Sequence, residues 1–190
     1  MENKNKVLLT VIGVATLLVA VVGATFAYFS ATDSSETVEV TTGAATISIS
    51  ASNNSVTNIK PTTFDYATAD SNTDVVKMTL EVTGSSDVAG SYKIVMNEPA
   101  ITIGSEANQG SVSDIKYVVY DSEGTKITDG SFVGSVSETT IVDNVAFDGS
   151  GEIADTYYVY VYVNNNDAEQ NNLQNVNFKL TFAANASTAA

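Results

Sequence analysis

The side chains that could carry chemistry in this sequence are carboxylates, tyrosines and amides, because the chain contains no cysteine, histidine or tryptophan. Their absence removes thiol nucleophiles, imidazole bases and imidazole metal ligands together. Paired carboxylates can hydrolyse glycosidic bonds when a cleft raises the pKa of one acid, and the spacing of the acids indicates no such pair. The sequence therefore predicts a protein that is not an enzyme and has no cofactor.

Two oxygen-rich segments are candidates for calcium, whose ligands are carboxylate and amide oxygens. One contains Asp143, Asp148 and Glu152, and the other is the run Asn164–Asp167. Neither has the spacing of an EF-hand loop. The alternative for both segments is an ordinary solvated turn, so calcium is kept as a secondary hypothesis.

Tyrosines and valines alternate along one predicted strand, with Tyr158, Tyr160 and Tyr162 on one face and Val159, Val161 and Val163 on the other. Successive side chains of a strand point to opposite sides of the sheet. The tyrosine face is a candidate surface for contact with another subunit or a glycan. The alternative is a central strand that is packed on both faces.

The charge of the chain limits its partners. There are 22 acidic residues and 8 basic ones, which gives a formal net charge of −14. Such a chain repels phosphate backbones and anionic lipid headgroups. We therefore expect no nucleic-acid partner.

The elements that must position these side chains begin with an apolar leader. Lys4 and Lys6 precede an uncharged apolar run from Val7 to Ala24, the pattern of an export signal. About 20 apolar residues can span a bilayer, whereas a signal peptide needs about 7–15. We expect a hydrophobic helix in residues 1–27 that is either a signal peptide or an uncleaved anchor, and membrane contact through this segment only.

The end of the leader has a candidate cleavage site. Small residues at Thr25 and Ala27 satisfy the small-x-small rule of signal peptidases, which places the cut between Ala27 and Tyr28. Cleavage at this site would remove two lysines and one glutamate, and it would change the net charge of the chain from −14 to −15. The predicted location is extracellular or at the cell surface, and the absence of cysteine suits a Gram-positive bacterium.

From Thr37 onward, apolar residues recur at every second position between clusters of Gly, Ser, Asn and Asp, which indicates antiparallel strands. About eight to ten strands are predicted, a number that fits a jelly-roll-like antiparallel β-sandwich. The predicted domain is single and covers residues 28–190. The residues expected on strand faces are Val38, Val40, Ile47, Ile49, Val76, Met78, Leu80, Val82, Tyr92, Ile94, Met96, Ile115, Tyr117, Val119, Phe178, Leu180 and Phe182.

Turn residues set the expected strand ends. Gly84–Asp87 is predicted to end the strand that contains Val82, and Asp121–Gly124 to form a hairpin turn with residues 125–128 as the returning strand. Further strands are expected over residues 139–145, 156–163 and 176–182. Ala183–Ala190 is expected to be a fraying tail.

The junction Gly23-Ala24-Thr25-Phe26-Ala27-Tyr28-Phe29-Ser30 resembles the TasA/camelysin family, whose apolar leaders end in Gly-Thr-aromatic-Ala-aromatic. Thr42–Ile49 and Asn58–Pro61 are similar to the family's first strand and following turn. The resemblance implies a dedicated signal peptidase and a jelly-roll-like subunit of extracellular fibres, as in a biofilm matrix. Members are also described as metallopeptidases, but this chain has no histidine for a zinc site, so no peptidase activity is expected.

If the leader is cleaved, residues 28–50 become an N-terminal arm that could add a strand to a neighbouring subunit. The alternative is that the arm folds back as an edge strand of its own domain. We expect self-association into filaments; the alternative is a monomeric membrane-tethered binding or adhesion module with loops such as Asn164–Gln170 as its contact surface. The assembly residues of the arm are Tyr28, Phe29, Val38, Val40, Ile47 and Ile49.

Overall fold

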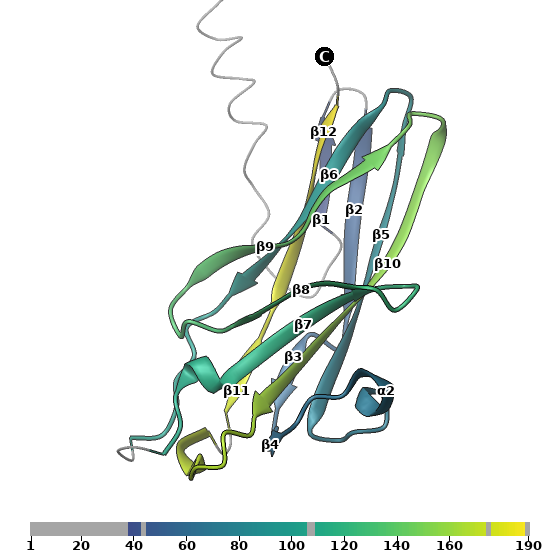
Figure 1. The fold of residues 1–190 in the computed structure, drawn as a ribbon. Helices are drawn as coiled ribbons and strands as arrows, with labels where there is room; N and C mark the ends of the chain where they lie inside the picture. The colour runs from purple at the N-terminus through teal and green to yellow at the C-terminus, as the bar shows by residue number, and fades with distance from the viewer. Residues whose placement is uncertain (1–37, 43–44, 106–108, 174–175, 189–190) are drawn as a thin grey trace, which may run out of the picture. The chain divides into compact units, whose positions relative to one another are not determined.

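The computed structural model describes residues 38–42, 45–105, 109–173 and 176–188, which form antiparallel sheets with one short α-helix (Figure 1). The chain is therefore all-β, as predicted. The expected N-terminal helix, the cleavage site Ala27/Tyr28 and the arm residue Phe29 lie outside the described residues. Within the described residues, no helix has the length and apolar character needed to cross a membrane.

The larger sheet is built around two long neighbouring strands, β5 and β10, that pair in antiparallel register from Val75↔Tyr162 to Ser86↔Gly151. A two-residue strand, β4, pairs with the end of β10 in parallel. The order across the sheet is β1 (Val38–Thr42), β2 (Ala45–Ser52), β5 (Val75–Ser86), β10 (Gly151–Asn164), β7 (Ile115–Asp121) and β8 (Lys126–Ser131), with β4 (Pro61–Thr62) beside β10.

Two smaller sheets complete the domain. The order of the first is β12 (Thr181–Thr188), β6 (Gly90–Glu98) and β9 (Ser137–Phe147), and the second pairs β3 (Ser55–Thr57) with β11 (Asn177–Lys179). The helical turns are α2 (Tyr66–Ala69), η1 (Val112–Asp114) and η2 (Asn171–Leu173).

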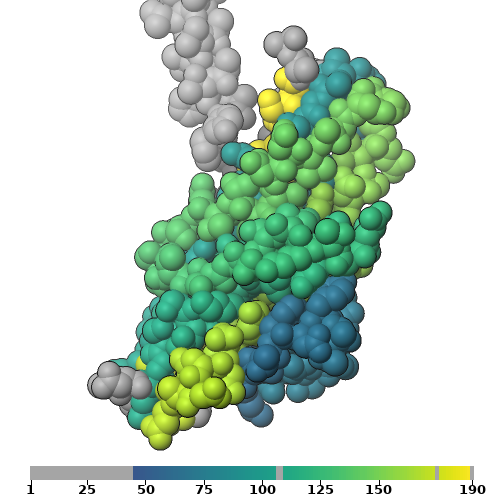
Figure 2. Space-filling view, in the orientation of Figure 1, coloured from purple at the N-terminus to yellow at the C-terminus, as the bar shows by residue number. Residues whose placement is uncertain are grey.

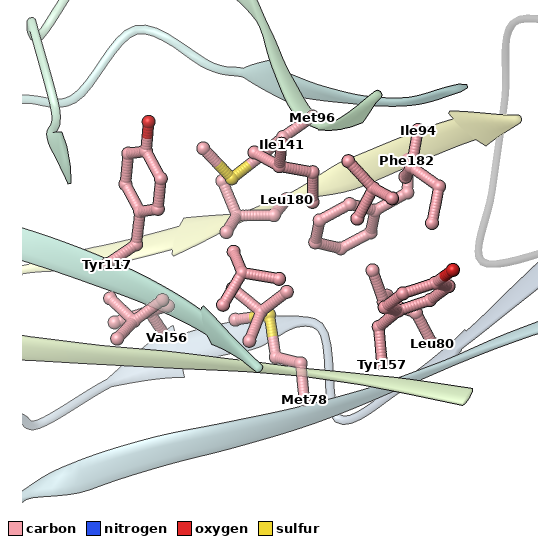
Figure 3. Close-up of a cluster of buried hydrophobic side chains, with 14 of the residues drawn as sticks. Val56, Met78, Leu80, Ile94, Met96, Tyr117, Ile141, Tyr157, Leu180 and Phe182 are labelled. Atoms are coloured by element: carbon pink, nitrogen blue, oxygen red, sulfur yellow. The ribbon is translucent and has the colours of Figure 1, made fainter. Parts of the chain in front are cut away.

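One hydrophobic core joins these sheets. Figure 3 shows Met78, Leu80 and Tyr157 of the larger sheet opposite Ile94 and Phe182 of the three-stranded sheet. Burial of these apolar faces is the main favourable contribution to folding. The core forms because the period-two pattern of each strand places its apolar residues on the face that meets the other sheet.

The predicted alternation is confirmed where side chains are described. Met78, Leu80 and Val82 are fully buried, and Val76 is half-buried. Tyr92, Ile115 and Phe178, which were predicted on the faces of other strands, are also buried. The predicted hairpin at Asp121–Gly124 is confirmed as β7 and β8, with Asp121 Oδ1 accepting hydrogen bonds from the backbone N–H of Glu123 and Thr125 at 3.0 and 2.7 Å.

The prediction that Ala183–Ala190 forms a fraying tail is wrong for residues 183–188, which the structure describes. β12 continues to Thr188 and pairs with β6 from Thr181↔Asn97 to Thr188↔Gly90. Ala184 has no exposed surface. The small side chains let β12 run close beside β1 and β2 (Figure 1), so a segment that looks like a linker in composition forms a core strand.

Two other strand limits also differ from the prediction. β5 does not stop at Gly84 but continues to Ser86, because Ser86 pairs with Ala45 on one side and Gly151 on the other. A Cβ at Gly84 would collide with the backbone oxygen of Thr46, so glycine is needed there for close approach and not for a turn.

The predicted strand at 176–182 is divided at Leu180. The backbone N–H of Leu180 donates to Asn54 O at 2.9 Å, and the chain passes there from its pairing with β3 to its pairing with β6. This division and the two short strands β3 and β4, which were not predicted, bring the number of strands in the described residues to twelve, above the predicted eight to ten.

The role of β12 leads to a prediction about truncation. A chain that ends at Phe182 should lose about 3 kcal/mol or more of unfolding free energy, because β6 loses its ladder partner and Ala184 leaves the core. Urea unfolding followed by circular dichroism would measure the loss. The matched control ends at Thr188 and should keep the stability of the full chain; equal midpoints for both truncations would contradict the role of β12.

Candidate functional site

The proposed assembly arm is part of the chain's own sheet over its described residues. β1 is the outermost strand, and within the described residues it pairs only with β2, from Val38↔Ile49 to Thr42↔Ala45. This register leaves two residues, 43 and 44, as the connection between the strands. Val38 and Val40 therefore lie on an edge strand that is separated from its partner by two residues of sequence.

The two isoleucines of the arm have a different environment. β2 lies between β1 and β5, and the side chains of Ile47 and Ile49 are 0% and 2% exposed. On the opposite face, the hydroxyls of Ser48 and Thr83 are 2.9 Å apart. In the isolated chain, residues 38–50 thus have the folded-back arrangement, with residues 45–50 inside the sheet and residues 38–42 at its edge.

The tyrosine face lies on the other side of the same sheet, on β10. The valine face of β10 enters the main core, with Val159, Val161 and Val163 fully buried. Tyr160 is only 2% exposed, whereas Tyr158 and Tyr162 are half-buried. The central tyrosine is therefore covered and its two neighbours are partly accessible.

The cover is the segment that contains α2, which forms a continuous blue surface in Figure 2. Asp65 is the N-cap residue of α2, and its Oδ1 accepts a hydrogen bond from the backbone N–H of Ala67 at 3.0 Å. This is the usual capping interaction of an aspartate at a helix N-terminus. Phe64 and Tyr66 are the neighbours of this capping residue in the sequence.

The covering rings stack on those of the sheet. The ring centroids of Phe64 and Tyr162 are 5.0 Å apart, and those of Tyr66 and Tyr120 are 4.1 Å apart. Tyr66 remains 39% exposed. The sequence analysis did not predict Phe64, Tyr66 or Tyr120 as site residues. Only Tyr120 could have been predicted, because the alternation of β7 places its side chain on the other face of the strand from that of Val119.

An ion pair lies at the edge of this aromatic cluster. Lys77 Nζ lies 2.8 Å from Asp70 Oδ2 and 4.1 Å from the ring centroid of Tyr158. The Tyr160 hydroxyl donates to Asp70 Oδ1 at 2.8 Å. The aromatic faces thus lie beside the Lys77–Asp70 ion pair, an arrangement suited to contact with another molecule.

These contacts shift the ionisation of all three groups. The hydrogen bond from Lys77, followed by the one from Tyr160, lowers the pKa of Asp70. Burial acts to lower the pKa of Lys77, but its hydrogen bonds with Asp70 and Tyr160 outweigh this effect and the pKa is raised. Burial and the hydrogen bond to Asp70 raise the pKa of Tyr160 to about 12. The pair is therefore charged, and Tyr160 neutral, at neutral pH.

The two predicted calcium segments use some of their oxygens in local turns. Asp148 Oδ1 accepts from the backbone N–H of Ser150 at 2.9 Å, while Asp143 and Glu152 are exposed. In the run Asn164–Asp167, Asn165 Oδ1 accepts from the backbone N–H of Asp167 at 3.0 Å, and Asn166 Oδ1 is used similarly. Over the described part of the chain, no three acidic residues gather as a metal-binding group.

Comparison with known proteins does not add a family assignment. No family model matches the sequence, and a search of curated proteins finds no significant relative. The candidate sites are therefore interpreted from their own geometry.

The ion pair of Asp70 leads to a prediction about acid stability. Because its pKa is lower in the folded chain than in the unfolded chain, where it is about 3.9, Asp70 contributes stability above that pH. The contribution is lost as the pH falls through the folded pKa. Asp70→Asn should therefore lower the unfolding free energy at pH 6, and its difference from the original protein should shrink below about pH 4.

Urea titrations between pH 2.5 and pH 7 would measure this difference. Asp65→Asn is the matched control, because asparagine also caps a helix and the Asp65 side chain caps α2. It removes one acidic charge from the same segment without breaking the ion pair of Asp70 with Lys77, so it should lower the unfolding free energy at pH 6 less than Asp70→Asn does. A difference for Asp70→Asn that stayed constant with pH would contradict the role of the Asp70 charge.

Proposed function

We propose that this protein is a secreted structural subunit of an extracellular fibre or biofilm matrix, built as a jelly-roll-like β-sandwich of the TasA/camelysin type. In this proposal the leader is removed by a signal peptidase and the subunits associate through an N-terminal strand. The observation that carries the proposal is the position of β1, an edge strand with one partner in the described chain and a two-residue connection to that partner.

Exchange of β1 between copies would cost little in contacts. If β1 of one copy pairs with β2 of the next, every pair from Val38↔Ile49 to Thr42↔Ala45 forms again between identical residues. An exchanged identical element is a low-cost route to association. When the exchange is head-to-tail and does not close into a ring, the product is an open filament.

The two-residue connection would be the hinge of the exchange. Positions 43 and 44 are Gly-Ala, and the hairpin requires the chain to reverse direction within these two residues. Straightening the connection removes the reversal and sends β1 away from its own domain. A short hinge loop promotes domain swapping when it is strained, because the exchanged form relieves that strain.

The burial of β2 indicates where the exchanged arm should end. Ile47 and Ile49 fill the core of their own domain, and exposure of each would cost about 1.5–3 kcal/mol. β1 has no such interior position in the sheet. We therefore propose residues 28–42 as the donated arm, with β2 as the strand that receives the arm of the next copy.

A second candidate is the membrane-tethered binding module, and the exposed part of the aromatic cluster favours it. Tyr66 is stacked on Tyr120 and remains 39% exposed. Tyr162, which Phe64 stacks on, is half-buried. Aromatic side chains of this kind are enriched at contact surfaces. N-terminal sequencing of the exported protein separates the candidates, because a chain that keeps Met1 and stays monomeric supports the tethered module and excludes the exchanged arm.

Engineered disulfides provide the decisive prediction for strand exchange. Glu39 and Ser48 are register partners of β1 and β2, and antiparallel partners have Cα atoms about 4.5–5.5 Å apart, within disulfide range. The chain has no native cysteine. The exported double variant Glu39→Cys/Ser48→Cys should give a ladder of covalent oligomers on a non-reducing gel, which collapses to monomer with dithiothreitol.

Two further pairs control this experiment. Thr83→Cys/Ala154→Cys links the exposed partners of β5 and β10 and should give monomer only. Ser48→Cys/Thr83→Cys links β2 to β5, so a ladder from this pair would show that the exchanged arm extends to residue 50. Cross-linked monomer alone from the Glu39/Ser48 pair, at high protein concentration, would refute exchange of β1.

A further inference from the structure

The stacked pair Tyr66–Tyr120 has a geometry that the other tyrosines in contact with it do not share. Its ring centroids are 4.1 Å apart, and its ring planes are inclined by 24°. The pairs Tyr66–Tyr160 and Tyr120–Tyr160 meet edge-on instead, at 84° and 85°. Among these three tyrosines, face-to-face contact is therefore confined to residues 66 and 120.

The stacked pair joins two segments that are far apart in the sequence. Tyr66 is the first residue of α2, in the segment that covers Tyr160, and Tyr120 lies on β7. A Cβ on Gly124, in the turn that follows β7, would lie 2.8 Å from the Tyr66 hydroxyl, so the side chain of Tyr66 reaches across to this turn. A bond between the two rings would thus hold the covering segment on the sheet.

The composition of the chain directs one-electron oxidation to tyrosine. Cysteine, tryptophan and histidine are absent, and Met78 and Met96 have no exposed surface. Cysteine and methionine are otherwise common sites of oxidation in proteins. Among the described tyrosines, Tyr66 is the most exposed, at 39%, so an oxidant in solution reaches it first.

Coupling of two tyrosyl radicals needs the kind of contact that this pair makes. An oxidant removes one electron and the phenolic proton from each ring, and the unpaired electron then resides partly on the carbons next to the C–O carbon. The π orbitals of these carbons point out of the ring plane, so stacked rings present them to each other. A carbon–carbon bond forms between one such carbon of each ring. Each of these carbons then loses its hydrogen as a proton while its own oxygen gains one, which restores two phenols.

We propose that Tyr66 and Tyr120 are a site of intramolecular dityrosine formation, which locks the segment of α2 to β7. The oxidant is hydrogen peroxide acting through a haem peroxidase: two tyrosines and one hydrogen peroxide give one dityrosine and two water molecules. The bond would serve this cysteine-free chain as a disulfide serves other proteins in oxidising surroundings. Its biological setting rests on the proposed extracellular location, but the reaction itself requires neither secretion nor strand exchange.

The experiment treats the purified protein, at about 1 μM, with a haem peroxidase and hydrogen peroxide. Groups held in one chain meet at an effective concentration in the millimolar range, roughly a thousandfold higher, so the product should be monomeric. Its mass should be lower by two hydrogen atoms, and peptide mapping should find Tyr66 joined to Tyr120. Dityrosine fluorescence follows the time course.

Thermal unfolding then compares the oxidised monomer with untreated protein. The bond closes a loop in the unfolded chain, so Tm should rise by about 5 °C or more. Dithiothreitol should not reverse the rise, because thiols do not reduce a carbon–carbon bond. A monomer that is linked at residues 66 and 120 and has an unchanged Tm would overturn the claim that the bond locks the segment.

Tyr120→Phe removes one phenol and keeps the stacked ring, so this variant should fold but lose both the intramolecular bond and the rise in Tm. Tyr162→Phe is the matched control, because it removes a half-buried phenol of the same cluster and leaves the stacked pair intact. It should keep both. If Tyr66 and Tyr120 are not joined, if Tyr66 reacts mainly between chains, or if the two variants behave alike, the proposal is wrong.

Discussion

The antiparallel pairing of β5 with β10 is the constraint on which the rest of the structure depends. These strands pair along their length, and each also has a second partner, β2 beside β5 and β7 beside β10. A slip of one residue would move Val159 and Val161 from the core to the tyrosine face. The register of this pair therefore determines which side chains of four strands enter the core.

The same register places a polar contact between the sheets. The hydroxyl of Tyr92 on β6 donates to Asp155 Oδ2 at 2.6 Å and lies 2.6 Å from the hydroxyl of Tyr157, both on β10. Burial, followed by these hydrogen bonds, raises the pKa of Tyr92 far above its usual range. Two large tyrosines can thus fill the core because their hydroxyls are hydrogen-bonded.

Much of the strand pattern could be predicted from the sequence, because alternation depends only on neighbouring residues. Ile47, Met78, Val159 and Phe182 were all expected on strand faces and are buried. Strand pairing, the change of sheet at Leu180 and the cover over Tyr160 could not be predicted, since each depends on contacts between distant parts of the chain.

The environment of β10 also determines how the domain opens. β10 has strand partners on both edges, a buried valine face and a tyrosine face that α2 partly covers, whereas β1 has one partner in the described chain. Local opening requires less free energy where fewer contacts must break. Backbone amides of β1 should therefore exchange with deuterium through local opening, and those of β10 through global unfolding. Release of β1 would then be a local fluctuation of the folded subunit that leaves its hydrophobic core intact.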